Sequence, residues 1–210
     1  APYRLRDARN GMRMGDKSVV DSMMHDGLTD AYDGSAMGVF ADMIAAEYQL
    51  SREQQDAYAV ESIRRAQQAQ ETGKFDREIA PVTVSTRKGD IVVDKDEGPT
   101  NAQAEKVPAL RPAFTKDGTV TAANASSIND GASAMVLMRK SEAEAGGHNV
   151  LAEIVAHGAH AHAPAYCTTA PVKAIEKALT RAGWSSDEVD LWEINEAFAV
   201  VTMAAIHDLD

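Results

Sequence analysis

The chain has 210 residues, 44% of them apolar and 25% charged, so it can bury one good core, or one domain plus a sizeable excursion. Its 21 Lys and Arg against 32 Asp and Glu give a formal net charge of −11, which argues against nucleic-acid binding and against coating an anionic membrane. No apolar run approaches the roughly 20 residues of a membrane helix, and the first ten residues lack a signal-peptide core. The single cysteine, Cys167, fits a reducing compartment, so we expect a cytoplasmic or organelle-matrix protein.

Two helices are predicted in the first third. Apolar residues recur at intervals of three and four from Met37 to Tyr48, which indicates an amphipathic helix. Ser51 and Gln54 form a capping box that opens a second, mostly polar helix through about Glu71, and Gly73 ends it. We expect this second helix to lie on the surface.

The middle of the chain has the pattern of strands and irregular backbone. Residues 79–84 and 91–93 are β-rich and are joined by a turn that contains glycine, which predicts a hairpin. Three prolines interrupt residues 94–114, so this stretch holds at most one short helix near residues 102–107. The nearly continuous apolar run at 132–138 suits a strand that is buried on both faces.

The last third alternates strand and helix. Residues 150–156 and 189–193 are strand candidates, whereas residues 172–182 and 197–207 have helical patterns. Such alternation predicts a layered α/β domain, over which residues 1 to about 115 would lie as an α+β insertion. The final helix stops without a cap, so we expect the chain to be a fragment.

Two polar segments are candidates for a site. Asn195 and Glu196 lie between apolar residues at a predicted strand-to-helix junction, where α/β sheets usually meet ligands. Asn195 is equally compatible with a plain helix N-cap. Residues 121–134 form a loop of small and polar side chains, which would let a ligand approach closely or would be a solvated turn.

These two segments carry a resemblance to a known family. Residues 121–134 resemble the thiolase pattern Asn-Ala-Ser-Gly-Ile/Leu-Asn-Asp-Gly-Ala, and residues 195–199, Asn-Glu-Ala-Phe-Ala, are identical to a second thiolase signature in the same order and separation. Further matches cover nearly the whole chain and lie at residues 26–28, 37–38, 50–57, 111–114 and 182–184. The resemblance implies a partial thiolase fold, layered α/β/α, with an α+β loop domain at 1–122 and portions of the core, incomplete at both ends, at 123–210.

The resemblance also implies a reaction. A cysteine thiolate takes an acyl group from one coenzyme A thioester, and the acyl group condenses with the α-carbon of a second thioester, or the reverse cleavage occurs. In the family this nucleophile lies upstream of residue 1, and a histidine and a second cysteine that act as bases lie beyond residue 210. We therefore expect no turnover by this chain alone. For the complete protein the resemblance implies acyl-CoA and coenzyme A as substrates and no permanently bound cofactor.

Site roles follow from the matched motifs. Asn195 would hold a water that completes an oxyanion hole with the missing histidine. Ser126 and the backbone from Ala122 would receive the pantetheine arm of coenzyme A. The apolar walls of that arm would be Leu28, Met37, Phe114, Ala197 and Phe198. The loop domain would cover coenzyme A and, in many members, help dimers pair into tetramers, so a homo-oligomer is expected. The role of Glu196 stays open.

Some positions depart from the family pattern. Ala123 and Ser127 stand where glycine is common, so a positive φ there would strain the loop. Ala36 occupies a position that is often histidine in biosynthetic members. A basic residue common near Pro99 is absent, which would leave phosphate contacts to the charges at positions 87, 88, 106 and 111, although a solvated surface charge explains each of them as well.

Other hypotheses remain at this stage. Cys167 aligns with a substrate-pocket position, not a catalytic one. His157, His160 and His162 lie within six residues and suggest a metal site, but no fourth ligand falls nearby. A non-catalytic module that keeps the fold is a third class, and the ketoacyl synthases share the architecture with different signatures. Acyl length and reaction direction are not determined by the sequence.

Overall fold

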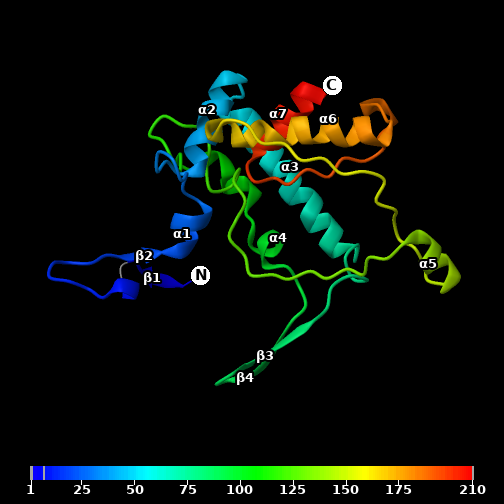
Figure 1. The fold of residues 1–210 in the computed structure, drawn as a ribbon, viewed down its shortest axis with the longest axis horizontal. Helices are drawn as coiled ribbons and strands as arrows, with labels where there is room; N and C mark the ends of the chain where they lie inside the picture. Colours follow the sequence, from blue (N-terminus) through cyan, green and yellow to red (C-terminus); the bar gives the residue numbers. More distant parts are fainter. Residues whose placement is uncertain (1, 7, 210) are drawn as a thin grey trace.

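The computed structural model describes residues 2–6 and 8–209, which form a helical body with extended arms (Figure 1). The α-helices are α1 (Ser22–Gly27), α2 (Met37–Glu47), α3 (Arg52–Glu71), α4 (Glu97–Asn101), α5 (Lys140–Ala145), α6 (Ala170–Ala182) and α7 (Ala199–Leu209). Short 3-10 helices cover Ala8–Asn10, Ala104–Ala109, Pro164–Thr169 and Ser186–Glu188. The helices α2, α3, α6 and α7 gather in the body, whereas α5 lies apart from it at the end of two extended segments.

The strands of the described residues pair in two antiparallel hairpins. Strand β1 (Tyr3–Leu5) pairs with β2 (Val19–Asp21), and β3 (Val82–Thr86) pairs with β4 (Gly89–Val93). In the second hairpin Thr86 faces Gly89, whose φ of 115° is readily adopted only by glycine. The predicted hairpin is therefore confirmed, with slightly different strand bounds, and it extends away from the body (Figure 1).

The predicted helices of the first third are confirmed. Helix α3 begins with the capping box, in which Gln54 N donates to Ser51 Oγ and Ser51 N donates to Gln54 Oε1. Most of α3 is exposed or half-buried, but Gln55, Asp56 and Ala59 are buried. The expectation of a surface helix is thus confirmed, and its one buried face covers two polar side chains and a small alanine, not large apolar side chains.

The core of the body lies between α2 and α7. It consists of the buried residues Ala41, Ile44, Ala45, Val120, Val200 and Ala204. Five of the six are alanine or valine, so the two helices approach each other closely, and Val120 adds the segment that leads into the 121–134 loop. This core therefore fixes the start of the predicted ligand loop beside the start of α7.

The strands predicted in the second half are not formed. Residues 132–138, 150–156 and 189–193 are extended, but none of them lies in a strand of the structure. Their apolar side chains are exposed, Val136 by 84% and Leu151 by 88%. The prediction of a strand buried on both faces at 132–138 is thus wrong within the described residues, because a strand exists only where a neighbouring segment accepts its backbone hydrogen bonds.

The predicted helices that flank these segments are present. Helix α6 ends at Gly183 in the left-handed conformation, with φ of 72°, and α7 occupies most of the predicted range 197–207. Residues 153–156 and 191–194 line a common hollow beside α6, which is the neighbourhood that a strand-helix-strand unit requires. Among the described residues, no helix is both long enough and apolar enough to cross a membrane.

Candidate functional site

The two sequence motifs meet in the structure. Ser126 N donates to Ala197 O at 3.0 Å, and Ser126 Oγ donates to the same oxygen at 3.2 Å. Ala125 and Phe198 form an antiparallel bridge, and Ala199 N donates to Asn124 O at 2.8 Å. Segments that are about 70 residues apart in sequence are therefore joined by backbone hydrogen bonds at the start of α7.

A buried polar network holds the loop from below. Asn124 is 3% exposed; its Oδ1 accepts from Thr121 N at 2.7 Å, and its Nδ2 donates to Asp56 Oδ1 at 3.2 Å. Asp56 is also paired with Arg52 on the same helix, where Nε to Oδ2 is 2.7 Å. Arg52 donates in turn to the carbonyl oxygen of Leu110 at 2.9 Å. Helix α3 thus anchors the loop through charged and amide groups that satisfy one another.

The predicted apolar residues form a contiguous group beside the loop. Met37 N donates to Leu28 O at 3.0 Å, which places these two residues side by side. The ring of Phe114 packs directly on Gly38, and its centroid lies 6.0 Å from that of Phe198 in an edge-to-face arrangement. Phe198 follows Ala197, the residue to which Ser126 is hydrogen-bonded, so the group borders the loop.

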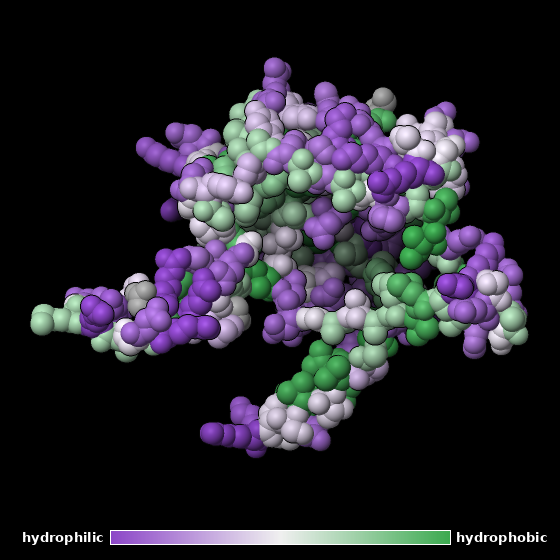
Figure 2. All heavy atoms as spheres, viewed as in Figure 1, coloured by the Kyte–Doolittle hydropathy of each residue, from purple (hydrophilic) through white to green (hydrophobic). Residues whose placement is uncertain are grey.

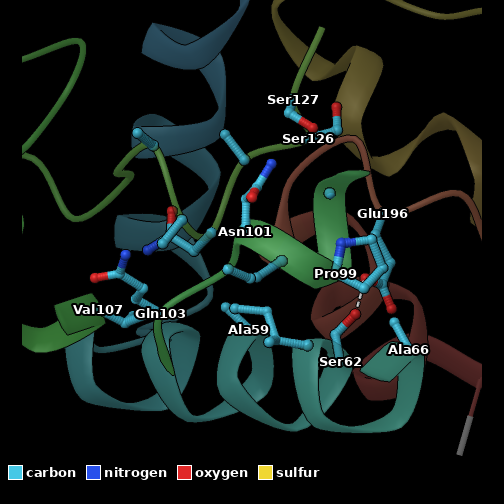
Figure 3. Close-up of a pocket in the computed structure, with 18 of the residues that line it drawn as sticks. Ala59, Ser62, Ala66, Pro99, Asn101, Gln103, Val107, Ser126, Ser127 and Glu196 are labelled. Carbon is cyan, nitrogen blue, oxygen red and sulfur yellow. Dashed lines mark hydrogen bonds between the residues drawn. The ribbon is translucent and has the colours of Figure 1, made fainter. Parts of the chain in front are cut away.

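A cavity of about 860 Å³ lies between α3 and the loop (Figure 3). Of the predicted site residues, Ala122, Ser126 and Asn195 line it. Leu28, Met37, Phe114, Ala197 and Phe198 do not line it and instead form the apolar group described above. The structure thus brings Asn195 and Ser126 to one hollow and places the apolar residues next to the loop but outside that hollow.

The alternative interpretation of Asn195 as a helix N-cap is wrong. Helix α7 begins at Ala199, four residues later, and its first amide donates to Asn124 O. The side chain of Asn195 is exposed and makes no hydrogen bond with any residue that the structure describes. An amide without a protein partner at the wall of a cavity is available to a water molecule or a ligand.

Glu196 has two hydrogen-bond partners that the sequence patterns did not reveal. Its carboxylate accepts from Tyr58 OH at 2.9 Å and from Ser62 Oγ at 2.6 Å, both on α3. Burial raises the pKa of the Tyr58 phenol above its ordinary value, which favours the protonated form that donates this hydrogen bond. The spacing of Tyr58 and Ser62 by one helical turn is the signal that places both hydroxyls on one face, but their partner lies more than 130 residues away.

The departures from the family pattern cause no strain in the loop. Neither Ala123 nor Ser127 has a positive φ, so glycine is not required at either position. Ala36 is the N-cap of α2 and supplies no side-chain cap. Of the four candidate basic residues, Lys106 lines the cavity, whereas Arg87 and Lys88 lie in the turn of the β3–β4 hairpin.

The cysteine and histidine hypotheses find no support in the geometry. Burial raises the pKa of the Cys167 thiol, which disfavours the nucleophilic thiolate. Among the described residues no three His, Cys, Asp or Glu side chains are arranged to hold a metal ion. Lys177 Nζ lies 3.2 Å from His160 Nδ1, and a positive charge at that distance opposes binding of a cation. The described residues therefore give the metal-binding alternative no geometric support.

Comparison with known protein families identifies two matching models. The first, described as thiolase, N-terminal domain, matches residues 1–141, and the second, thiolase, C-terminal domain, matches residues 148–210. A probable acetyl-CoA acyltransferase of Staphylococcus aureus (strain COL) is 46% identical, with 100% of this chain and 54% of that protein covered. Acetyl-CoA acetyltransferase 1 of Arabidopsis thaliana is 49% identical, covering 97% of this chain and 50% of its own length.

Solved structures agree with these matches. An acetyl-CoA acetyltransferase from Bacillus anthracis superposes with a TM-score of 0.94 at 38% identity, covering 100% of this chain and 53% of that one. An acetyl-CoA acetyltransferase from Syntrophomonas wolfei superposes with a TM-score of 0.89 at 41% identity, and the match covers 99% of this chain and 52% of that one. The chain thus spans about half the length of the curated relatives it matches, and its backbone follows theirs despite the missing strand pairing.

Proposed function

Because the chain belongs to the thiolase family, we propose that the complete protein transfers acyl groups between coenzyme A thioesters, by Claisen condensation or by thiolytic cleavage of a 3-ketoacyl-CoA. The observation that carries the proposal is the hydrogen-bonded junction between Ser126 and Ala197, which sets the Asn195 turn and the small-residue loop around one cavity. Coenzyme A thioesters are substrates in this proposal, and no permanently bound cofactor is needed.

Asn195 is the catalytic residue that this chain contributes. Its exposed amide would hold a water that donates a hydrogen bond to the thioester enolate oxygen, together with a histidine supplied by the rest of the protein. Such preorganised donors stabilise charge that develops only in the transition state. The absence of a protein partner for the Asn195 side chain within the described residues supports this role.

The pantetheine arm of coenzyme A would lie along the loop. Ser126 and the backbone from Ala122 offer polar contacts, and the half-buried residues Leu28 and Met37 with the ring of Phe114 provide an apolar surface beside them. An arm with amide groups and methylene groups requires this combination of hydrogen-bonding and apolar neighbours. Ala197 and Phe198 connect the two parts, because Ser126 of the loop is hydrogen-bonded to Ala197 and the ring of Phe114 packs on that of Phe198.

Residues 1–122 would form the loop domain, and the protein would act as a dimer or tetramer in the cytoplasm. The β1–β2 hairpin supports an oligomer, since Met12 and Met14 at its end are 58% and 102% exposed. Apolar side chains on a projecting arm are typical of protein contacts. Light scattering on the complete protein tests this part, and a monomer at micromolar concentration would contradict it.

The test of the catalytic role is Asn195→Ala in the complete protein. We expect kcat for thiolysis of acetoacetyl-CoA to fall by about 10²–10³-fold with little change in KM, as for loss of an oxyanion donor. The matched control is Asn101→Ala, which removes another amide from the same cavity and should leave kcat unchanged. Residues 1–210 alone should give no turnover, since their only cysteine is Cys167.

Two outcomes would contradict the proposal. A complete protein that binds acyl-CoA but forms no product would favour the non-catalytic module, and an unchanged kcat in Asn195→Ala would remove the role of this amide. Assays with acetoacetyl-CoA and with longer 3-ketoacyl-CoA substrates determine the preferred acyl length.

A further inference from the structure

Glu196 is a carboxylate directly next to the proposed oxyanion residue. It lines the cavity that contains Asn195 and Ser126, and it also lines a second hollow on the other side, formed by α3, α7 and residues 186–194. Its carboxylate therefore lies in the wall between two open spaces. The direction in which this group points decides whether its negative charge faces the thioester.

Two hydroxyl groups of α3 hold this carboxylate. Ser62 Oγ donates to Oε2 at 2.6 Å and Tyr58 OH donates to Oε1 at 2.9 Å, so each carboxylate oxygen has its own donor (the Ser62 bond is drawn in Figure 3). Hydrogen bonds to an ionised acceptor are shorter and stronger than those between neutral groups. Glu196 is thereby attached to α3, the helix whose buried Asp56 also accepts a hydrogen bond from Asn124 of the ligand loop.

The negative charge of Glu196 makes its two hydrogen bonds to α3 important for the thioester reaction. A free carboxylate beside Asn195 would repel the negative oxygen that develops on the thioester, because like charges at close range repel strongly in a partly buried site. Two donors that fix and partly neutralise the carboxylate reduce this repulsion. They also hold the peptide turn that carries Asn195.

We propose that Glu196 is a positioning residue that Tyr58 and Ser62 clamp against α3, which fixes the Asn195 turn and holds the Glu196 charge against two donors at the wall of the thioester cleft. This inference rests on the proposed function, because the clamp affects catalysis only if Asn195 stabilises the thioester enolate. Helix α3, which belongs to the expected loop domain, would then support the catalytic turn in addition to covering coenzyme A.

The experiment removes the donors and leaves the motif intact. In the complete protein, the double variant Tyr58→Phe with Ser62→Ala should lower kcat for thiolysis about 10-fold while KM changes less than about twofold. Tyr32→Phe, an exposed tyrosine far from the motif in sequence, is the control and should leave both parameters unchanged.

A charge test separates the clamp from a general loss of structure. In the Glu196→Gln background the same double variant should lose less than about threefold in kcat, because an unheld amide places no charge beside the oxyanion. An equal loss in both backgrounds would show that the hydroxyls are merely structural and would overturn the proposal. Wild-type kcat in the double variant would overturn it as well.

A second measurement does not depend on turnover. Hydrogen exchange of the backbone amides of residues 195–198 should be faster in the double variant than in wild type, since the turn loses its attachment to α3. Unchanged exchange would contradict the clamp even in an inactive protein. If instead wild-type protein shows no thiolysis while this exchange responds as expected, the proposed function fails and the clamp stands.

Discussion

The Arg52–Asp56 pair is the residue-scale contact on which the ligand loop depends. Asp56 is 6% exposed and accepts from both Arg52 and Asn124, so it connects α3 to the loop. Asp56→Asn should lower the free energy of unfolding by about 2 kcal/mol, below the full cost of an unpaired buried charge because Arg52 keeps some contact with solvent. Chemical denaturation of the complete protein measures the change.

The same helix offers a matched control for this prediction. Arg65 and Glu61 form another pair four residues apart, but both side chains are exposed and solvent screens their attraction. Glu61→Gln should therefore change the unfolding transition little. Equal effects of the two substitutions would show that burial of Asp56 adds nothing to its pairing.

Only some residues of the site were predictable from the sequence. Asn195 and Ser126 belong to motifs that are contiguous in sequence, so their pattern was sufficient to single them out. Asn124, the loop partner of Asp56, lies 68 residues away from it, and the partners of Glu196 lie more than 130 residues away. No local pattern reports which distant hydroxyl or amide will meet a carboxylate. The predicted roles of the site residues stay predictions until the variants are measured.

At the scale of elements, α2 and the Phe114 segment pack too closely for any side chain at Gly38. A Cβ built at this position would lie 2.2 Å from two ring atoms of Phe114, so the ring would have to move. Gly38→Ala should destabilise the protein by about 1–3 kcal/mol through overpacking. It should also raise KM for acyl-CoA, because Phe114 borders the proposed pantetheine site.

Gly27→Ala is the control for this substitution. Gly27 is also helical and an added Cβ there would meet nothing within 4 Å, so only the gain in helix propensity remains. Phe114→Leu combined with Gly38→Ala should recover part of the lost stability. Thermal unfolding of the four proteins decides, and equal melting temperatures for Gly38→Ala and wild type would contradict the close approach.

Helices α2 and α7 are also joined by a contact that responds to pH. Tyr48 OH donates to Asp208 Oδ2 at 2.7 Å, and burial, with Asp208 next, raises the pKa of Tyr48 to about 12. Between pH 10 and 12 the unfolded chain loses this proton while the folded chain keeps it. Stability is therefore fully present below pH 10 and falls as pH rises through the folded-state pKa.

The substitution that tests this is Tyr48→Phe. We expect it to weaken the decline in unfolding free energy between pH 10 and 12 relative to wild type, since the variant has no proton to lose there. At pH 8 it should be slightly less stable, because Asp208 loses a donor. Parallel pH profiles for the two proteins would contradict the link.

The helices and the β3–β4 hairpin were predictable and the strands expected at 132–138, 150–156 and 189–193 were not, for one physical reason. The capping box at Ser51 and the glycine after α6 act within four residues, so the sequence next to them determines where those helices begin and end. A strand needs a partner that a local pattern does not contain. The β3–β4 hairpin supplies its own partner and forms, whereas residues 132–138 have none within the described chain and remain extended.

At the scale of the whole molecule, the described residues form a partial thiolase fold with exposed apolar segments. Figure 2 shows apolar residues along the β3–β4 hairpin and on the extended segments on either side of α5. Among the exposed residues are Met135, Val136, Leu151, Ile154 and Leu191. The expected division into a loop domain at 1–122 and core portions at 123–210 remains a prediction. Helix α3, from the first part, is hydrogen-bonded to Asn124 and Glu196 of the second part.

These exposed segments predict how residues 1–210 behave when they are prepared alone. Extended, apolar backbone with free hydrogen-bonding groups is a template for pairing with other chains. The isolated chain should therefore bind an apolar dye such as ANS and self-associate at micromolar concentration, whereas the complete protein should do neither beyond its defined oligomer. The double variant Val136→Lys with Leu151→Lys should reduce this self-association, because charges at these exposed positions oppose strand pairing. A monodisperse isolated chain without dye binding would mean that these segments pair with one another in solution.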